Sequence, residues 1–116
     1  MSHLNLLIAM TKLEKAVKSS LNARSYRLQF AQELPKHGLT YIQLECLYEI
    51  RKAKCQPSYI ADKPFHERAS VSRVLKELDG KKLISYTHDT VDRRKVYVEI
   101  SNKGKSILDL IEAATN

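Results

Sequence analysis

The chain opens with a long stretch in which apolar residues recur at helical spacing. Residues 1–34 contain no glycine or proline, and their apolar positions lie three, four or seven residues apart. These positions are Leu6, Met10, Leu13, Val17, Leu21, Leu28 and Ala31. Pro35 and Gly38 then provide stop signals. The pattern predicts an N-terminal helix over residues 1–36, either continuous or bent near residues 22–25.

Two shorter helices are predicted in the middle of the chain. The first begins at Thr40, which forms a capping-box pattern with Gln43 and precedes an apolar face. That face consists of Ile42, Cys46, Leu47 and Ile50. After a polar link over residues 52–56, Pro57 suits the first position of a short helix that Pro64 ends.

A further helix is predicted over residues 68–79. Its apolar residues follow the i, i+3, i+4, i+7 pattern of a buried stripe: Val71, Val74, Leu75 and Leu78. On a helical wheel, the opposite side carries small residues and cations, namely Ala69, Ser72, Arg73 and Lys76. Ser70 lies on the flank near the helix N-terminus, where its hydroxyl and the helix dipole favour an anion such as phosphate.

The last third of the chain changes from helical spacing to a period of two. Val96, Val98 and Ile100 alternate with Lys95, Tyr97 and Glu99, which is typical of a half-buried strand. We predict strands over residues 83–88 and 95–100, joined by a polar loop that contains Asp92, Arg93 and Arg94. Ser101 begins a final helix whose apolar side is Ile107, Leu108 and Ile111. The predicted fold is mainly α with a small antiparallel β-hairpin, in a single domain over residues 1–116.

A continuous N-terminal helix would overrun its own domain. About 30 residues at 1.5 Å each make a helix roughly 45 Å long, whereas a compact domain of this length has a radius of gyration of about 13 Å. Part of the apolar stripe would then need a partner, and a second copy of the chain would provide one. The alternative is two shorter helices that fold back on one core.

The net charge of +7 at pH 7 is concentrated around the helix at residues 68–79 and the hairpin. Residues 51–105 contain 14 Lys or Arg and 7 Asp or Glu, whereas residues 1–50 have a balance of +2 and residues 106–116 a balance of −2. Basic surfaces attract polyanions through counterion release. The distribution indicates nucleic-acid contact, and the alternative is a charged surface that only maintains solubility.

Other classes of protein are not favoured. No apolar run reaches about 18 residues, and the N-terminus lacks a basic leader and a small-residue cleavage site. Gly38, Gly80 and Gly104 suit helix boundaries, so no phosphate-cradling loop of an enzyme is expected. Cys46 is expected in the core and Cys55 in the polar link, without metal-ligand spacing to the histidines. We therefore expect a cytoplasmic protein that is not an enzyme and has no metal or cofactor.

Short motifs follow one another from residue 37 to residue 104 in a defined order. They are His37-Gly-Leu-Thr40 with Gln43, Ile60-Ala61 followed by Arg68-Ala-Ser-Val-Ser-Arg73, Asp92-Arg93-Arg94, and Val98-Glu-Ile-Ser101-Asn-Lys-Gly104. Together they resemble the MarR family of bacterial transcription regulators. The first resembles the family's Gly-Leu-Thr-x-x-Gln motif, the second its helix-turn-helix core, and the last two its wing and the segment after it. The resemblance covers roughly residues 38–110.

This resemblance implies a winged helix-turn-helix that binds double-stranded DNA as a homodimer. Residues 1–36 and 101–116 would form the N- and C-terminal dimerisation helices, and residues 40–100 the DNA-binding winged helix. The recognition helix would face the major groove through Ser70, Ser72, Arg73 and Lys76, and the wing would enter the minor groove through Arg94 and Arg93. Asp92 would hold an arginine in place by a charge-assisted hydrogen bond. A small-molecule effector is a further candidate partner.

Two features depart from the family pattern. The family usually has glycine before the Leu-Ile of the first wing strand, where this chain has Lys82. Either Gly80 ends the recognition helix as a left-handed cap, or Lys82 itself takes the left-handed conformation. The short final helix predicts a smaller dimer arm and a reduced effector pocket.

The combined interpretation is a sequence-specific transcriptional regulator that acts as a homodimer on a pseudo-palindromic operator, with repression as the favoured mode. The alternative is a winged helix used as a protein-interaction module, or an accessory factor without a specific operator. Such modules keep the core and lose the basic face, so the basic face of residues 68–79 favours DNA binding.

Overall fold

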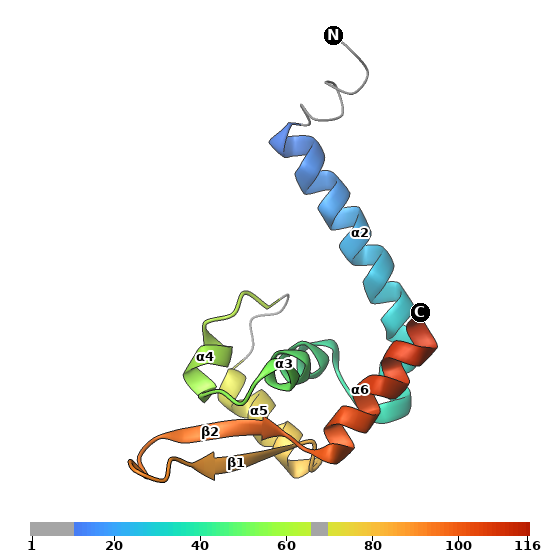
Figure 1. Cartoon of the computed structure of the whole chain (residues 1–116). Coiled ribbons are helices and arrows are strands. Elements are labelled where there is room, and N and C mark those ends of the chain that lie inside the picture. The colour runs from blue at the N-terminus through green and yellow to red at the C-terminus, as the bar shows by residue number, and fades with distance from the viewer. Residues whose placement is uncertain (1–10, 66–69) are drawn as a thin grey trace.

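The computed structural model describes residues 11–65 and 70–116, and Figure 1 shows them as a small body from which one long helix projects. The elements are α2 (Lys12–Glu33), the 3-10 helix η1 (Leu34–His37), α3 (Tyr41–Lys52), α4 (Pro57–Ala61), α5 (Val71–Gly80), β1 (Ile84–His88), β2 (Val96–Ile100) and α6 (Asn102–Thr115). The predicted fold, mainly α with one antiparallel hairpin, is confirmed. Within the described ranges, no helix is long and apolar enough to cross a membrane.

Helix α2 runs unbroken for 22 residues, so the alternative of two shorter helices folded onto one core is wrong for residues 12–33. Thr11 caps its start, because Thr11 Oγ1 accepts a hydrogen bond from Glu14 N at 3.1 Å. No residue of α2 is buried, and only its C-terminal part approaches the body (Figure 1). The radius of gyration is 17.9 Å, well above the value of about 13 Å for a compact domain of this length. Residues 1–10 of the predicted helix lie outside the described residues.

The turn from η1 into α3 is built by local signals that the sequence contains. Gly38 ends η1 with φ of 66°, a left-handed conformation that glycine adopts without steric cost. The predicted capping box is confirmed: Gln43 N donates to Thr40 Oγ1 at 3.3 Å, and Thr40 N donates to Gln43 Oε1 at 3.1 Å. Helix α3 thus begins in a fixed register, which turns its apolar face into the core.

The core lies between α3, α5, the hairpin and α6 (Figure 1). Its fully buried members include Cys46, Leu47, Ile50, Ile60, Val74, Leu75, Leu78, Leu83, Val98 and Ile111. Pro57 occupies the first turn of α4, as predicted, and delivers Ile60 to this core. The regular spacing of apolar residues in α3 and α5 therefore marks the packed surface correctly.

The hairpin pairs β1 with β2 in a register from Ile84 opposite Ile100 to His88 opposite Val96. The predicted polar link before Pro57 takes part in this sheet, which the sequence did not indicate. Cys55 N donates to Val98 O at 3.2 Å, and Val98 N donates to Cys55 O at 2.7 Å. This bridge fastens the inner strand of the wing to the segment between α3 and α4.

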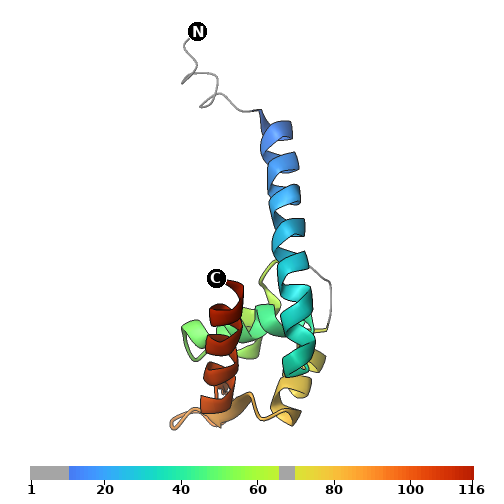
Figure 2. The same ribbon diagram turned by 90° about the vertical axis from the view of Figure 1, so that its right-hand side faces the viewer.

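Helix α6 connects the body to α2. Ser101 caps its start, because Gly104 N donates to Ser101 Oγ at 3.0 Å. Figure 2 shows α6 beside the C-terminal half of α2, where Gln29 Nε2 donates to Thr115 O at 2.9 Å. Arg51 Nη2 of α3 lies 2.6 Å from Glu112 Oε1. These contacts hold α6 against both helices.

The segment between α5 and the hairpin was predicted to contain one left-handed residue, either Gly80 or Lys82. Gly80 is the last residue of α5 and does not have a positive φ, whereas Lys82 has φ of 61°. Ser101 Oγ donates to Lys82 O at 2.7 Å, and Leu83 N donates to Leu78 O at 3.0 Å. The left-handed residue is therefore Lys82, held from both sides, at a cost of about 1 kcal/mol for a non-glycine side chain.

Candidate nucleic-acid interface

Helix α5 separates an apolar side from a polar side. Val74, Leu75 and Leu78 are fully buried and Val71 is half-buried, so the predicted stripe packs against the body. The other side exposes Ser72, Arg73, Lys76 and Glu77. The exposed side of α5 therefore presents hydroxyl, cationic and carboxylate groups to solvent.

The start of α5 differs from the prediction. The helix begins at Val71, and Ser70 is its N-cap with extended backbone rather than a residue of the first turn. Serine is among the preferred N-cap residues, and this signal would have located the boundary. The Ser70 side chain makes no capping bond, and its Oγ lies 3.0 Å from Ser72 Oγ. Residues 66–69, including the predicted Ala69, lie outside the described residues.

The wing loop is held by two aspartates. Asp89 Oδ1 accepts hydrogen bonds from Val91 N at 2.8 Å and Asp92 N at 2.9 Å, which fixes the turn and holds the pKa of Asp89 below its usual value. Asp92 Oδ1 accepts from Arg94 Nε at 3.1 Å, and Asp92 Oδ2 from Arg94 Nη2 at 3.3 Å. This bidentate contact, with a third hydrogen bond that Arg94 N donates to Asp92 Oδ1 at 3.1 Å, holds the pKa of Asp92 below its usual value.

Asp92 therefore orients Arg94, as predicted for an arginine of the wing. The Arg94 side chain is 91% exposed despite this contact, so its guanidinium is both held and accessible. Arg93 is exposed beside it, and its carbonyl oxygen lies 2.9 Å from His88 Nδ1. Figure 1 shows the tip of the hairpin and the N-terminal end of α5 on the side of the body remote from α6.

The two cysteines are poor candidates for chemistry at this site. Cys46 is fully buried, and burial, with Glu45 and Glu49 nearby, raises the pKa of its thiol to about 12. The pKa of Cys55 is also raised, mainly by burial and next by Glu49, although Lys63 opposes this. A reactive thiol needs a lowered pKa. Among the residues that the structure describes, no group of His, Cys, Asp and Glu is arranged to hold a metal ion.

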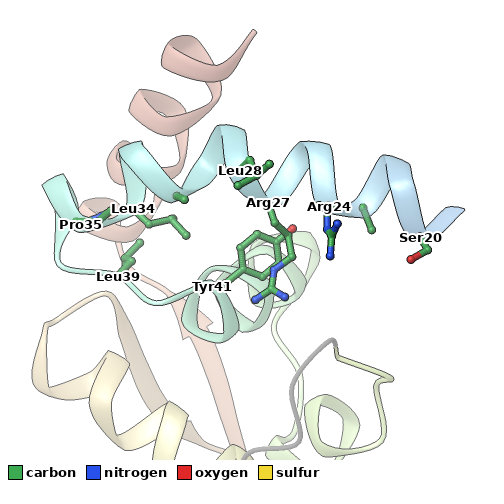
Figure 3. A pocket seen from close by; sticks show the side chains of 10 residues that line it. Ser20, Arg24, Arg27, Leu28, Leu34, Pro35, Leu39 and Tyr41 are labelled. Atoms are coloured by element: carbon green, nitrogen blue, oxygen red, sulfur yellow. The ribbon is translucent and has the colours of Figure 1, made fainter. Parts of the chain in front are cut away.

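A pocket of about 870 Å³ lies between α2 and the start of α3. Its walls are Ser20, Ala23, Arg24, Arg27, Leu28, Ala31, Leu34, Pro35, Leu39 and Tyr41. Figure 3 shows Arg24 and Arg27 extending from α2 on the side that faces Tyr41. The Arg27 guanidinium carbon lies 4.8 Å from the centre of the Tyr41 ring. The pocket therefore combines apolar walls with cationic groups.

A buried helical stripe, an exposed basic helix face and an adjoining hairpin define a winged helix-turn-helix, a class of DNA-binding protein. The model of the MarR family matches residues 37–95, about half of the chain. The chain belongs to the MarR family of transcriptional regulators.

Solved structures of similar fold agree with this assignment. YusO from Bacillus subtilis is 24% identical with a TM-score of 0.68, and the match covers 99% of this chain and 79% of YusO. The MarR protein is 25% identical with a TM-score of 0.66, covering 90% and 75%. BpsR from Bordetella bronchiseptica, whose DNA binding is regulated by 6-hydroxynicotinic acid, is 27% identical with a TM-score of 0.62, covering 83% and 76%. Among curated proteins, none matches this chain significantly.

Proposed function

We propose that this protein represses transcription by occupying a pseudo-palindromic operator as a homodimer. In each subunit, Ser70, Ser72, Arg73 and Lys76 contact the major groove. Arg94 and Arg93 enter the minor groove, with Asp92 orienting Arg94. The observation that carries the proposal is the two-sided character of α5, with Val74, Leu75 and Leu78 buried and Ser72, Arg73 and Lys76 exposed. Repression requires only that the bound dimer exclude other proteins from the promoter.

The homodimer is supported by an exposed apolar stripe on α2. Leu13, Val17, Leu21 and Leu28 are each at least half exposed, and they share one face of the helix. Such a stripe on a projecting helix is stabilised by packing against a partner helix. Two-fold symmetry would set the two copies of α5 about one helical turn of DNA apart, roughly 10 bp. The operator is accordingly expected to be pseudo-palindromic.

The test begins with selection of bound sites from random duplex DNA. Arg73→Ala is expected to weaken binding to the selected site by about 1–3 kcal/mol and to relax the preference at one base pair.

Arg94→Ala should weaken binding and reduce the preference for A·T-rich flanks, where a narrow minor groove attracts arginine. The measurement is a salt titration of affinity for the selected and scrambled duplexes.

Lys18→Ala is the matched control, because it removes one exposed cation from α2, which projects away from α5 and the wing (Figure 1). Its affinity should equal that of the wild type. If Arg73→Ala weakens binding to all duplexes equally, Arg73 contacts phosphate and does not read a base pair. Absence of DNA binding at low salt would contradict the proposed function and favour a protein-interaction module.

We further propose that the pocket beneath α2 binds a small anionic effector. BpsR provides the precedent of a regulator controlled by an aromatic carboxylate, and Arg24 and Arg27 supply cations next to apolar walls here. A ligand at 100 times its dissociation constant stabilises the protein by about 2.7 kcal/mol. A panel of aromatic carboxylates, including 6-hydroxynicotinic acid, is expected to contain one that raises the melting temperature and releases DNA. Arg24→Gln should abolish both effects; no shift at millimolar concentration would contradict the effector.

A further inference from the structure

Gln43 is a buried polar side chain, only 2% exposed, at the start of α3. Its Oε1 accepts two hydrogen bonds, from Thr40 N at 3.1 Å and from Lys81 Nζ at 2.8 Å. Lys81 Nζ also donates to the Gly38 carbonyl. Two donors on one side of the amide fix its orientation, so the Nε2 group must point toward α5. Gln43 therefore completes the capping box of α3 and also directs a hydrogen-bond donor at α5.

The donor that Gln43 directs at α5 is received by Glu77. Gln43 Nε2 donates to Glu77 Oε2 at 2.5 Å, and the other carboxylate oxygen, Oε1, lies 3.4 Å from Arg73 Nε. Each oxygen of Glu77 therefore has a different partner. A continuous chain of polar contacts runs from the buried end of α3 to an arginine on the exposed face of α5.

The exposed face of α5 that carries Arg73 also carries the acidic residue Glu77. Glu77 is 41% exposed and repels any phosphate that approaches Arg73, so on charge alone it lowers affinity for DNA. An ordinary exposed pair between residues i and i+4 holds its arginine weakly. Here the buried Gln43 amide holds the carboxylate from behind, which makes Glu77 a fixed acceptor. Fixing Arg73 Nε leaves the terminal guanidinium nitrogens, which carry the donors for a bidentate contact with guanine.

We propose that Glu77 is a positioning residue that directs Arg73 at one base pair, and that Gln43 anchors Glu77 from the protein interior. The inference rests on the proposed function, because it requires Arg73 to read DNA. Glu77 lowers affinity for every sequence and in return restricts the directions in which Arg73 can donate. Loss of Glu77 is therefore expected to raise affinity for every sequence and to lower the discrimination between sequences.

The test compares affinity for the selected site with affinity for a scrambled duplex of the same composition, at one salt concentration. In Glu77→Gln, an acceptor oxygen remains on only one of the two sides that the carboxylate oxygens occupy, so the new NH2 group faces the donor of either Gln43 Nε2 or Arg73 Nε. We expect affinity for the scrambled duplex to rise about threefold through loss of a negative charge, and the ratio of the two affinities to fall about tenfold. Asp79→Asn is the control, since it removes the same charge from an exposed position of α5; its ratio should not change.

The exchange of the two side chains separates positioning from charge. In the double variant Gln43→Glu with Glu77→Gln, the buried carboxylate accepts from Thr40 N, Lys81 and the new amide at position 77, whose oxygen then faces Arg73. This variant should recover the wild-type ratio within about twofold, whereas Gln43→Glu alone places two carboxylates together and loses it. Thermal melting of each variant verifies that it is folded.

The outcomes distinguish the inference from the function on which it rests. If the wild type does not distinguish the two duplexes, the proposed function fails. If it does distinguish them and Glu77→Gln keeps the wild-type ratio, Glu77 is not a positioning residue. A further requirement is that Glu77→Gln leave the ratio unchanged in an Arg73→Ala background; a tenfold fall there would assign the effect to another residue and overturn the inference.

Discussion

Gly104→Ala is expected to destabilise the protein by about 3 kcal/mol, the upper part of the range for overpacking a filled site. A Cβ on Gly104 would lie 2.4 Å from the Leu83 carbonyl oxygen and 2.8 Å from Ile100 Cγ1. The carbonyl belongs to backbone and already accepts from Ser101 N at 2.9 Å, so it cannot move without breaking the contact between α6 and the start of β1. For a domain of this size, the melting temperature should fall by roughly 10 °C.

Gly80→Ala provides the matched control for this result. Gly80 ends α5 without a positive φ, and a Cβ there meets no atom within 4 Å in the described structure. Replacing it with alanine should leave stability unchanged or raise it by up to about 1 kcal/mol through better helix propensity. Thermal melting of both variants measures the difference. Equal melting temperatures for Gly104→Ala and the wild type would show that α6 and β1 separate without cost.

The elements that the sequence predicted correctly are those whose signal is local. Apolar spacing placed Val74, Leu75 and Leu78 in the core, and alternation located both strands to within one residue of their observed bounds. The capping box of Thr40 and Gln43 located the start of α3. Apolar residues that are buried on one face recur every few residues, and a free backbone donor at a helix start is bonded by a side chain three residues away. Both signals therefore lie within a short stretch of sequence.

The features that the sequence alone did not decide depend on contacts between segments that are far apart in the chain. Gln43 and Glu77 are 34 residues apart, and no local pattern indicates that their side chains touch. The pairing of Cys55 with Val98 is likewise decided by the approach of the segment before α4 to the wing. For residues 80–82 the sequence left two alternatives, and contacts of Ser101 and the end of α5 with the backbone at residues 82–83 accompany the left-handed conformation of Lys82. On the exposed side of α5, the cations were predicted from the sequence, whereas the contacts that link Gln43 through Glu77 to Arg73 were not.

Leu21→Glu is expected to convert the proposed homodimer into a folded monomer and to weaken operator binding at least about 100-fold, since binding of the second half-site would no longer be intramolecular. At 100° per residue, Leu13, Val17, Leu21 and Leu28 fall within about 80° of the helix circumference, and Leu21 lies near the middle of the stripe along the helix axis. Glutamate there would place a charge in the apolar seam between two copies of α2. The monomer should remain folded, because no residue of α2 is buried in the isolated chain.

Light scattering after size exclusion measures the mass, and a fluorescence titration with the selected duplex measures the affinity. Ser19→Glu is the control, since it adds the same charge to α2 on the side opposite the stripe, where the residue is exposed; it should remain dimeric with wild-type affinity. If Leu21→Glu stays dimeric, the apolar stripe of α2 is not the dimer interface. A monomeric Leu21→Glu protein that binds the full site with wild-type affinity would refute the two-fold model itself, because the second half-site would then contribute nothing to binding.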